Sequence, residues 1–538
     1  MNESGVRMKS NVEKKRFRVV ALVAEAAFLL SSCGGGGSPS APSAPPAAPA
    51  SITDAAAVRF LEQASFGPNA AEVARVKTMG FSAWLDEQFA LPATYLPRPA
   101  DKAALDVIQA SFFANALGAT DQLRQRVAFA LSQIYVISDL KVDNRQGIAS
   151  FYGVLLKDAF GPHQQLLKDV TLEPAMGRFL DMADNTKADP AAGVSPNENY
   201  AREVMQLFSV GLVKLNADGS PALDAAGKPV PSYDQNTVEG FSRVFTGWTY
   251  ASAPGAVPQD FNPANFNAPL VSHETYHEPG TKVLLGGFTQ AAGQTAPQDL
   301  DAAMANIVQQ ANVGPFLATR LIQALVKSNP SRAYVQRVSA AYADNGAGLR
   351  GDMKSVVKSV LLDVEARAGD SQPAGASDGK LREPVLYMTR LLRAMNAKSS
   401  GVGLPAYSQP MRQDVFAAPS VFNFYPPTYK VQGTTLFGPE FKIVNAPTLA
   451  SRVAFANDLS ANTLPLGTTV DASDLLAVAG DANALVSLLD SKLMHGVSSD
   501  KLKATTAQAI AAAGSSPGAR VSTGLYVYAA SPSFWIQR

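Results

Sequence analysis

The stretch SPNENYAREVMQLF, residues 195–208, brings two carboxylates, an arginine and two asparagines into the opening turns of a predicted helix. Two carboxylates can divide the roles of general acid and general base when their environments separate their pKa values. Hydrolysis is a reaction class that uses such a pair. We therefore take Glu203, Glu198 and Arg202 as candidate catalytic residues, with Glu203 as the acid or base and the other two in support.

Helical geometry gives each of these side chains a predicted place. Ser195 suits the N-cap position and Pro196 the first helical position, so Glu198 falls where it would complete a capping box. Glu198 and Arg202 are four residues apart, which predicts an ion pair on the solvent face. Glu203 lies on the shoulder of the apolar stripe, where burial raises a carboxyl pKa unless a partner compensates. A helix cap for Glu198 and a structural hydrogen bond or salt bridge for Glu203 are the alternatives.

Three further residues are candidates for ligand binding: Asn199, Trp248 and His277. Asn199 precedes Glu203 by one helical turn, and Trp248 belongs to an aromatic cluster. Exposed rings beside polar loops can stack on sugar faces or on a polymer chain, although buried rings that hold long loops give the same sequence pattern. Similar aromatic clusters occupy residues 261–266 and 422–429.

The segment HETYH, residues 273–277, matches the zinc-protease pattern HExxH, which needs two imidazoles one turn apart on a helix. Pro269 and Pro279 leave no room for that helix, so we do not expect zinc chemistry here. Residues 216–224 offer carboxylate oxygens but lack the EF-hand spacing, and they predict turns instead. We therefore predict no metal site, and the sequence names no cofactor.

The composition indicates a chain that can bury a large core, with 538 residues, 46% hydrophobic and 17% charged. Of the 46 basic and 45 acidic residues, six and three lie within residues 1–32, which leaves 40 and 42 in the rest. The main body is thus nearly neutral. This balance argues against nucleic acid as a partner.

Residues 1–32 have the layout of a lipoprotein-type signal peptide, in which a basic cluster and a short apolar segment are followed by LSSC. That tetrapeptide is similar to a lipobox and ends at Cys33, the only cysteine, which we expect to be lipidated. Residues 33–52, rich in Gly, Pro, Ser and Ala, predict a flexible tether. The expected location is the cell envelope, bound to the membrane through the lipid. Gly34 in place of Asp favours the outer membrane if the source is Gram-negative.

Beyond the tether, apolar residues recur at helical spacing, and strand patterns are sparse. We predict a mainly α fold: a large multi-helical body with long loops and one small β-hairpin region at residues 213–233. Residues 53–538 are expected to form a single domain. Pro-rich or Gly-rich breaks give possible sub-boundaries near 251–270, 366–379 and 398–440. Helix starts are predicted at Thr53 and Asp121, which suit the N-cap position.

Several segments resemble the bacterial domain of unknown function 1800 family. They include RFLEQASFGP, SPNENYAREVMQLFSVGL, TVEGFSRVFTGW, YHEPGTKVLLGG, KLREPVLYMTRLLRAM, APSVFNFYPPTY and AASPSFWIQR, in family order from about residue 54 to the end. The resemblance implies an exported, mainly helical protein, often encoded beside an exported protein of the domain of unknown function 1501 family. It brings no established activity and no assigned catalytic residues.

The function that we expect is an envelope-anchored binding or assembly module for a partner protein or polymer. The tether, the neutral charge and the absence of a complete catalytic motif favour it. The alternative is a hydrolase-like enzyme that uses Glu203 with a second carboxylate. The helical positions place Glu198 and Glu203 on different faces, so that second carboxylate would come from elsewhere in the chain.

Overall fold

The apolar residues at helical spacing do form helices. The computed structural model describes residues 51–100, 103–371, 375 and 378–538. These residues form 23 α-helices and small two-stranded antiparallel sheets, and 52% of the described residues are helical. The predicted mainly α class is therefore confirmed. The predicted signal peptide, Cys33 and the tether up to residue 50 lie outside the described residues.

The helices follow one another with few long interruptions until residue 400. The first group is α1 (Asp54–Ala64), α2 (Ala70–Met79), α3 (Phe81–Ala90), α4 (Leu105–Gly118), α5 (Gln122–Leu131), α6 (Asp139–Val142), α7 (Arg145–Asp158), α8 (His163–Leu172) and α9 (Pro174–Phe179). The second is α10 (Asn199–Gln206), α11 (Gln235–Val244), α12 (Ala296–Gln309), α13 (Val313–Leu325), α14 (Arg332–Ala343), α15 (Met353–Leu362) and α16 (Val364–Arg367). The third is α17 (Pro384–Ala394), α18 (Pro405–Ser408), α19 (Ala446–Ser460), α20 (Ser473–Ala477), α21 (Ala482–Met494), α22 (Asp500–Ala512) and α23 (Pro517–Ala530).

The strands are two residues long and pair across large sequence distances as well as locally. They are β1 (Trp248–Thr249), β2 (Val271–Ser272), β3 (Lys282–Val283), β4 (Thr289–Gln290), β5 (Lys380–Leu381), β6 (Lys398–Ser399), β7 (Thr468–Thr469) and β8 (Ile536–Gln537). They pair as β1–β2, β3–β4, β5–β8 and β6–β7. Short 3₁₀ helices are η1 (Glu274–Tyr276), η2 (Leu285–Gly287), η3 (Ala368–Asp370) and η4 (Pro439–Ile443).

The predicted hairpin region folds back on itself through isolated antiparallel bridges. Val213 pairs with Pro231, and Leu215 pairs with Pro221. Prolines lack the N–H that a continuous ladder needs, which explains why no regular strand forms there. We call residues 212–232 the hairpin loop.

A side-chain cap forms at one of the two predicted N-cap residues and not at the other. Thr53 Oγ1 accepts the Ala56 N–H at 3.1 Å, so the predicted cap of α1 is confirmed. Asp121 precedes α5 but makes no side-chain cap. Its carboxylate instead accepts the Thr94 N–H at 2.9 Å and an amide N–H of Gln125 at 3.1 Å. A hydrogen bond with the preceding loop thus takes the place of the expected helix cap.

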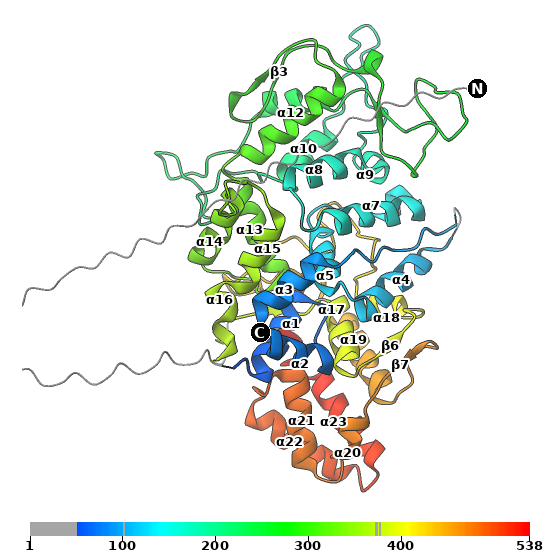
Figure 1. The fold of residues 1–538 in the computed structure, drawn as a ribbon, viewed down its shortest axis with the longest axis vertical. Coiled ribbons are helices and arrows are strands. Elements are labelled where there is room, and N and C mark those ends of the chain that lie inside the picture. Colours follow the sequence, from blue (N-terminus) through cyan, green and yellow to red (C-terminus); the bar gives the residue numbers. More distant parts are fainter. Residues whose placement is uncertain (1–50, 101–102, 372–374, 376–377) are drawn as a thin grey trace, which may run out of the picture. The chain divides into compact units, whose positions relative to one another are not determined.

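Helices distant in sequence pack together. In Figure 1 the C-terminal helices α21, α22 and α23, in orange and red, form one group, and α23 also packs on α19. The N-terminal helix α1 contacts α21, and β5 pairs with the C-terminal strand β8. Both ends of the described chain are therefore fixed to the same part of the fold.

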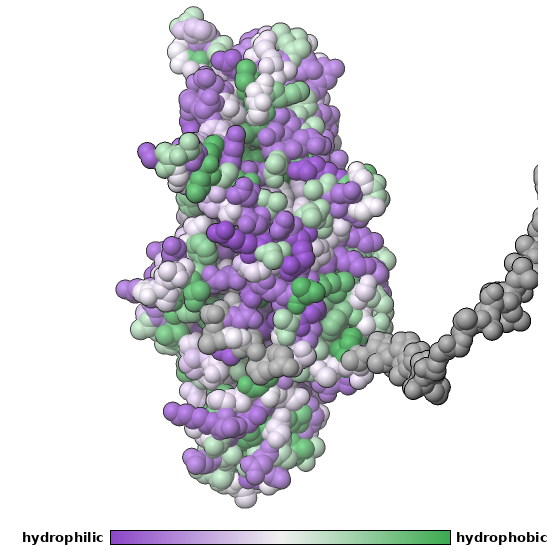
Figure 2. Space-filling view, turned by 90° about the vertical axis from the view of Figure 1, so that its left-hand side faces the viewer, coloured by the Kyte–Doolittle hydropathy of each residue, from purple (hydrophilic) through white to green (hydrophobic). Residues whose placement is uncertain are grey.

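The surface is mixed in character. On the face drawn in Figure 2, small hydrophobic areas alternate with hydrophilic ones. Within the described residues, no helix has both the length and the apolar character needed to cross a bilayer.

Candidate functional site

The helix α10 begins later than the sequence predicts. Glu198 is its N-cap residue and makes no side-chain cap, and the predicted capping box with Ser195 does not form. The reason is that Asn197 already fixes the entry: its side-chain oxygen accepts the Asn199 N–H at 2.8 Å. Its own N–H is donated to the side-chain oxygen of Asn185, also at 2.8 Å. The segment before α10 is thus held by a neighbouring loop.

Glu198 and Arg202 form the predicted ion pair, with 2.5 Å between Arg202 Nη2 and Glu198 Oε2. Gln235, at the start of α11, joins both: it donates to Glu198 Oε1 at 2.9 Å and accepts from Arg202 at 2.8 Å. These groups are partly exposed, and ion pairs in solvent contribute little to stability. The pair therefore links α10 to α11 on the surface.

Glu203 is partly desolvated, as its helical position predicts. Burial raises the pKa of its carboxyl group above the usual value, and the charge of Arg202 opposes that rise. Its Oε2 atom is buried without a hydrogen-bond partner among the described residues. No hydrogen bond or ion pair in the described chain joins Glu203 to Glu198 or His277. Glu203 thus remains a candidate general acid or base, but no second carboxylate is hydrogen-bonded to it.

Asn199 lines a cavity of about 320 Å³. Its side-chain amide donates to Asp181 at 2.9 Å, and Lys141 pairs with the same carboxylate at 2.8 Å. Residues 418–421 line the same cavity. The structure therefore brings two of the family-like segments, SPNENYARE and APSVFNFYPP, to one hollow.

The other two predicted binding residues are buried elsewhere. Trp248 is 4% exposed and lies in β1. His277 is 3% exposed. Its Nδ1 lies 2.9 Å from the Thr246 carbonyl oxygen and its Nε2 lies 3.0 Å from Asp299 Oδ2, which also pairs with Lys282. Neither lines the cavity beside Asn199.

The HETYH segment lacks the helix that a zinc site needs. Only a 3₁₀ turn forms at Glu274–Tyr276, and His273 is turned to Asp260, 3.2 Å away. Glu274 accepts the Ala296 N–H at 3.1 Å at the start of α12. The described residues contain no group of three or more His, Cys, Asp or Glu side chains that would hold a metal.

A larger hollow than the one beside Asn199 is a groove that sequence reasoning missed. It has a volume of about 650 Å³ and is lined by residues from 206–221, 316–335 and 422–437. Nine of its 24 lining residues are aliphatic or aromatic and four more are prolines. Three of its large apolar side chains are exposed: Leu212 at 60%, Phe422 at 47% and Phe437 at 36%. A volume of roughly 300–1,000 Å³ is typical of ligand pockets in proteins.

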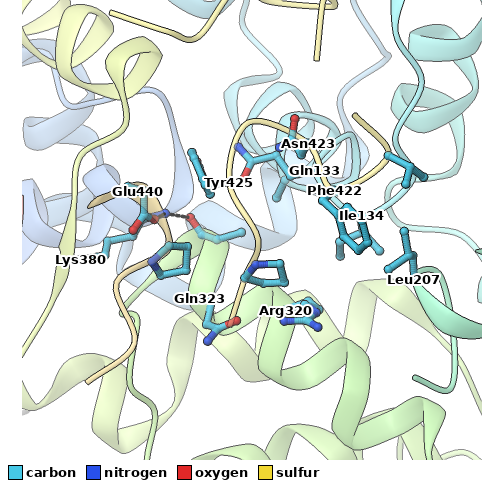
Figure 3. Close-up of a pocket in the computed structure, with 15 residues that line it drawn as sticks. Gln133, Ile134, Leu207, Arg320, Gln323, Lys380, Phe422, Asn423, Tyr425 and Glu440 are labelled. Atoms are coloured by element: carbon cyan, nitrogen blue, oxygen red, sulfur yellow. Dashed lines mark hydrogen bonds and ion pairs between the residues drawn. The ribbon is translucent and has the colours of Figure 1, made fainter. Parts of the chain in front are cut away.

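The groove adjoins a smaller inner cavity of about 70 Å³, because the same side chains line both. These shared residues are Leu207, Arg320, Gln323, Phe422 and Pro427. Figure 3 shows this inner cavity, with Leu207 and Arg320 on one side and Lys380 and Glu440 on the other. The C-terminal end of α10 therefore reaches the groove, through Gln206 and the following residue Leu207.

A cluster of buried charges lies at the far side of the inner cavity. Lys380 Nζ is 3.0 Å from Glu440 Oε1 and donates to the Ala324 carbonyl oxygen at 2.9 Å. Glu383 accepts the Tyr425 hydroxyl at 2.6 Å. Burial raises the pKa of Glu440 above its usual value, against the charge of Lys380. These contacts fix the loop that carries Tyr425, which is one wall of the groove.

The missed residues carry few local signs of their role. Arg320 lies in an ordinary helical pattern, and Phe422 lies in a Pro-rich loop whose aromatic cluster was noted as a binding candidate. The segments that form the groove come from positions more than 100 residues apart in some cases, as the bond between Asn329 and Phe437 shows. Only that aromatic cluster among prolines could have directed attention to this wall.

A family model described as a protein of unknown function (DUF1800) matches residues 59–536, nearly the whole chain. The chain belongs to this family. The matched range contains α10, the groove and the buried charges beside it. No curated protein and no solved structure matches the chain.

Proposed function

We propose that this DUF1800 protein is a binding or assembly module of the cell envelope, and that the groove is where it docks a partner protein. The observation that carries the proposal is the groove of about 650 Å³ with exposed apolar side chains on two of its walls. Exposed apolar residues gathered around a concave site are typical of binding surfaces.

A partner protein fits the lining better than a sugar polymer. Leu212, Val213 and Leu215 from the hairpin loop and Val335 from α14 line one part of the groove. Aliphatic side chains of this kind gain most from contact with other apolar side chains, because the free energy of burial follows apolar area. A sugar has hydroxyl groups around its ring and offers little such area.

The partner proposed for the first test is the exported protein of the domain of unknown function 1501 family that the family resemblance suggests. Binding of the purified full-length proteins is measured by surface plasmon resonance. Leu212→Asp should weaken binding by about tenfold or more, since a carboxylate would be buried against apolar side chains. Leu466→Asp is the matched control, because Leu466 is 94% exposed and lies outside the groove. Equal affinities for the two variants would contradict the proposal.

The location in the envelope is a separate proposal, and it rests on the N-terminal residues. A lipid on Cys33 followed by the tether at 33–52 would hold the body at a membrane, the outer membrane if the source is Gram-negative. Membrane fractionation of Cys33→Ala tests it. Release of the variant into the soluble fraction supports the anchor, and unchanged retention counts against it.

Hydrolysis is the second candidate function, and one observation favours it: the raised pKa of Glu203 beside an unpaired oxygen atom. Such perturbation occurs at catalytic carboxylates and also at structural ones. The test compares Glu203→Gln with Glu198→Gln in assays on peptide, ester and glycoside substrates. Turnover by the wild type that only Glu203→Gln abolishes would favour the enzyme over the docking module.

A further inference from the structure

Arg320 has an unused guanidinium group. It lies on α13 and makes no hydrogen bond and no ion pair with any described residue. Its guanidinium carbon lies over the ring of Phe316, 5.1 Å from the ring centre. Other arginines of the core make at least one hydrogen bond: Arg126 donates to the Ala324 carbonyl oxygen at 2.6 Å, and Arg452 donates to that of Arg382 at 2.8 Å. Arg320 therefore keeps five N–H donors for something else.

The position of Arg320 makes those donors available to a ligand. Its side chain lines both the groove and the inner cavity, so it lies where the two spaces meet. In Figure 3 it lies between Gln323 and Leu207, away from the Lys380–Glu440 pair. Burial lowers the pKa of Arg320 to about 10, which still leaves it charged at neutral pH. A cation in a largely apolar space is stabilised by an anion that enters it.

The nearby carboxylates have other partners. Asp218, on the hairpin loop, accepts both the N–H and the hydroxyl of Ser220, at 2.9 and 2.6 Å. Glu440, in the inner cavity, pairs with Lys380. The charge of Arg320 is therefore left for a group from outside the chain.

Gln323 adds a second unsatisfied atom one turn along the same helix face. Its amide N–H donates to the Ser328 carbonyl oxygen at 3.2 Å, and its Oε1 atom is buried without a donor. Residues three apart on a helix have Cβ atoms about 5–6 Å apart. The groove thus presents a cationic donor and a neutral acceptor one helical turn apart on α13.

The ligand must therefore carry an anion, an N–H donor and apolar surface together. A fatty acid has the carboxylate and the apolar tail but no N–H. An acidic sugar has donors but little apolar surface for Val210 and Leu207. The last residues of a polypeptide have all three, because the terminal carboxylate and the N–H of the same residue lie one residue's length apart.

We propose that the groove captures the free carboxyl terminus of a partner polypeptide whose last residues are apolar, with Arg320 binding the terminal carboxylate and Gln323 accepting the last N–H. This inference rests on the proposed docking function and narrows it to one kind of segment. Arginine suits the role because its planar fork can donate two parallel hydrogen bonds to one carboxylate.

The test uses the full-length protein and a pool of fluorescein-labelled hexapeptides whose last three positions are drawn from Ala, Val, Leu and Phe. One pool has a free carboxyl terminus and the matched pool is amidated. Fluorescence anisotropy should show that amidation weakens binding by about tenfold or more, as expected for the loss of a buried charge pair. Arg320→Gln should weaken binding of the free pool to the same extent, and amidation should then have no further effect.

Arg332→Gln is the matched control, since Arg332 also lines the groove but is exposed. It should change the affinity by less than about threefold, as for a rim charge. Circular dichroism checks that each variant is folded. The inference is overturned if the free pool does not bind, if free and amidated pools bind equally, or if Arg320→Gln binds as the wild type does.

Laurate serves as a further probe. If laurate binds in an Arg320-dependent manner and the peptides do not, the ligand is a fatty acid and the peptide assignment is wrong. If the peptide test fails, the effect of Leu212→Asp on binding of the partner protein still stands. The general docking function and this narrower inference are therefore judged separately.

Discussion

Two charged side chains in this protein lie in contrasting surroundings, Glu62 on α1 and Arg320 on α13. Glu62 is buried and Arg320 is partly buried. Glu62 pairs with cations, whereas Arg320 pairs with no carboxylate among the described residues. Arg382 Nη2 lies 2.9 Å from each Glu62 oxygen, and Arg390 pairs with the same carboxylate. His495 Nε2 is 3.0 Å away.

The difference separates a structural charge from a binding one. Glu62 joins the first helix to residues 320 and 328 positions later in the chain, and the small cavity beside it holds only about 10 Å³. Such a cluster fixes how distant segments meet. Arg320 instead faces two connected hollows, where a compensating charge can only come from a ligand. Whether a charge finds its partner inside the chain thus distinguishes the two roles.

The largest expected effect is on the Glu62 cluster. Glu62→Gln should lower the free energy of unfolding by about 3–5 kcal/mol, because two buried arginines lose their counter-charge. Urea denaturation followed by circular dichroism measures it. Glu198→Gln is the control, since its exposed pair with Arg202 contributes less than about 1 kcal/mol. If the two variants unfold alike, the structural role assigned to Glu62 is wrong.

Acid should weaken the same cluster. Burial alone would raise the pKa of Glu62, but the charges of Arg382, His495 and Arg390 outweigh it and hold the pKa well below its usual value of 4.5. A carboxylate with a lowered folded-state pKa adds stability above the unfolded value and loses it as the pH falls through the folded value. The stability gap between wild type and Glu62→Gln should therefore be widest above pH 4.5 and should narrow at lower pH in a pH series of urea unfolding. A gap that is constant with pH would speak against the ion cluster.

Glu173 is a third side chain for this comparison. It is a buried carboxyl group that lines neither the groove nor the inner cavity. Burial raises its pKa from 4.5 to about 7, and its Oε1 has no partner among the described residues. The sign is opposite to that of Glu62, because a raised pKa lowers stability as the pH rises from the unfolded value to the folded one.

Glu173→Gln should therefore raise the free energy of unfolding above pH 7 by up to about 3 kcal/mol, and the gain should vanish near pH 4.5. Thermal unfolding at the two pH values gives the comparison. A variant that is less stable at both would show that the carboxylate has a charge partner that the contacts do not reveal.

The smallest effect is expected for Arg320. Because its guanidinium has no hydrogen bond or ion pair to lose among the described residues, Arg320→Gln should change the free energy of unfolding by less than about 1 kcal/mol. Urea unfolding beside Glu62→Gln provides the direct contrast. A loss as large as that of Glu62→Gln would mean that Arg320 supports the fold, and the distinction between the two charges would disappear.

Local chemistry explains what could be predicted from the sequence. Helical spacing identified α1 and the Thr53 cap, and the four-residue spacing of Glu198 and Arg202 predicted their ion pair, since residues within one turn meet in any helix. The partial burial of Glu203 followed from its angle on the apolar stripe. The predicted Ser195 capping box was wrong, because hydrogen bonds of Asn197 to Asn185 and Asn199 fix the start of the helix instead.

The sequence by itself determined the mainly α class, the family and the neutral body, because composition and periodicity depend only on residue types and their spacing. Tertiary structure alone decided that Glu62 is compensated and that Arg320 is not. It also separated Trp248 and His277 from Asn199 and built the groove from three distant segments. The physical reason is that long-range packing selects which charges and rings meet, and no pattern within one or two helical turns contains that information.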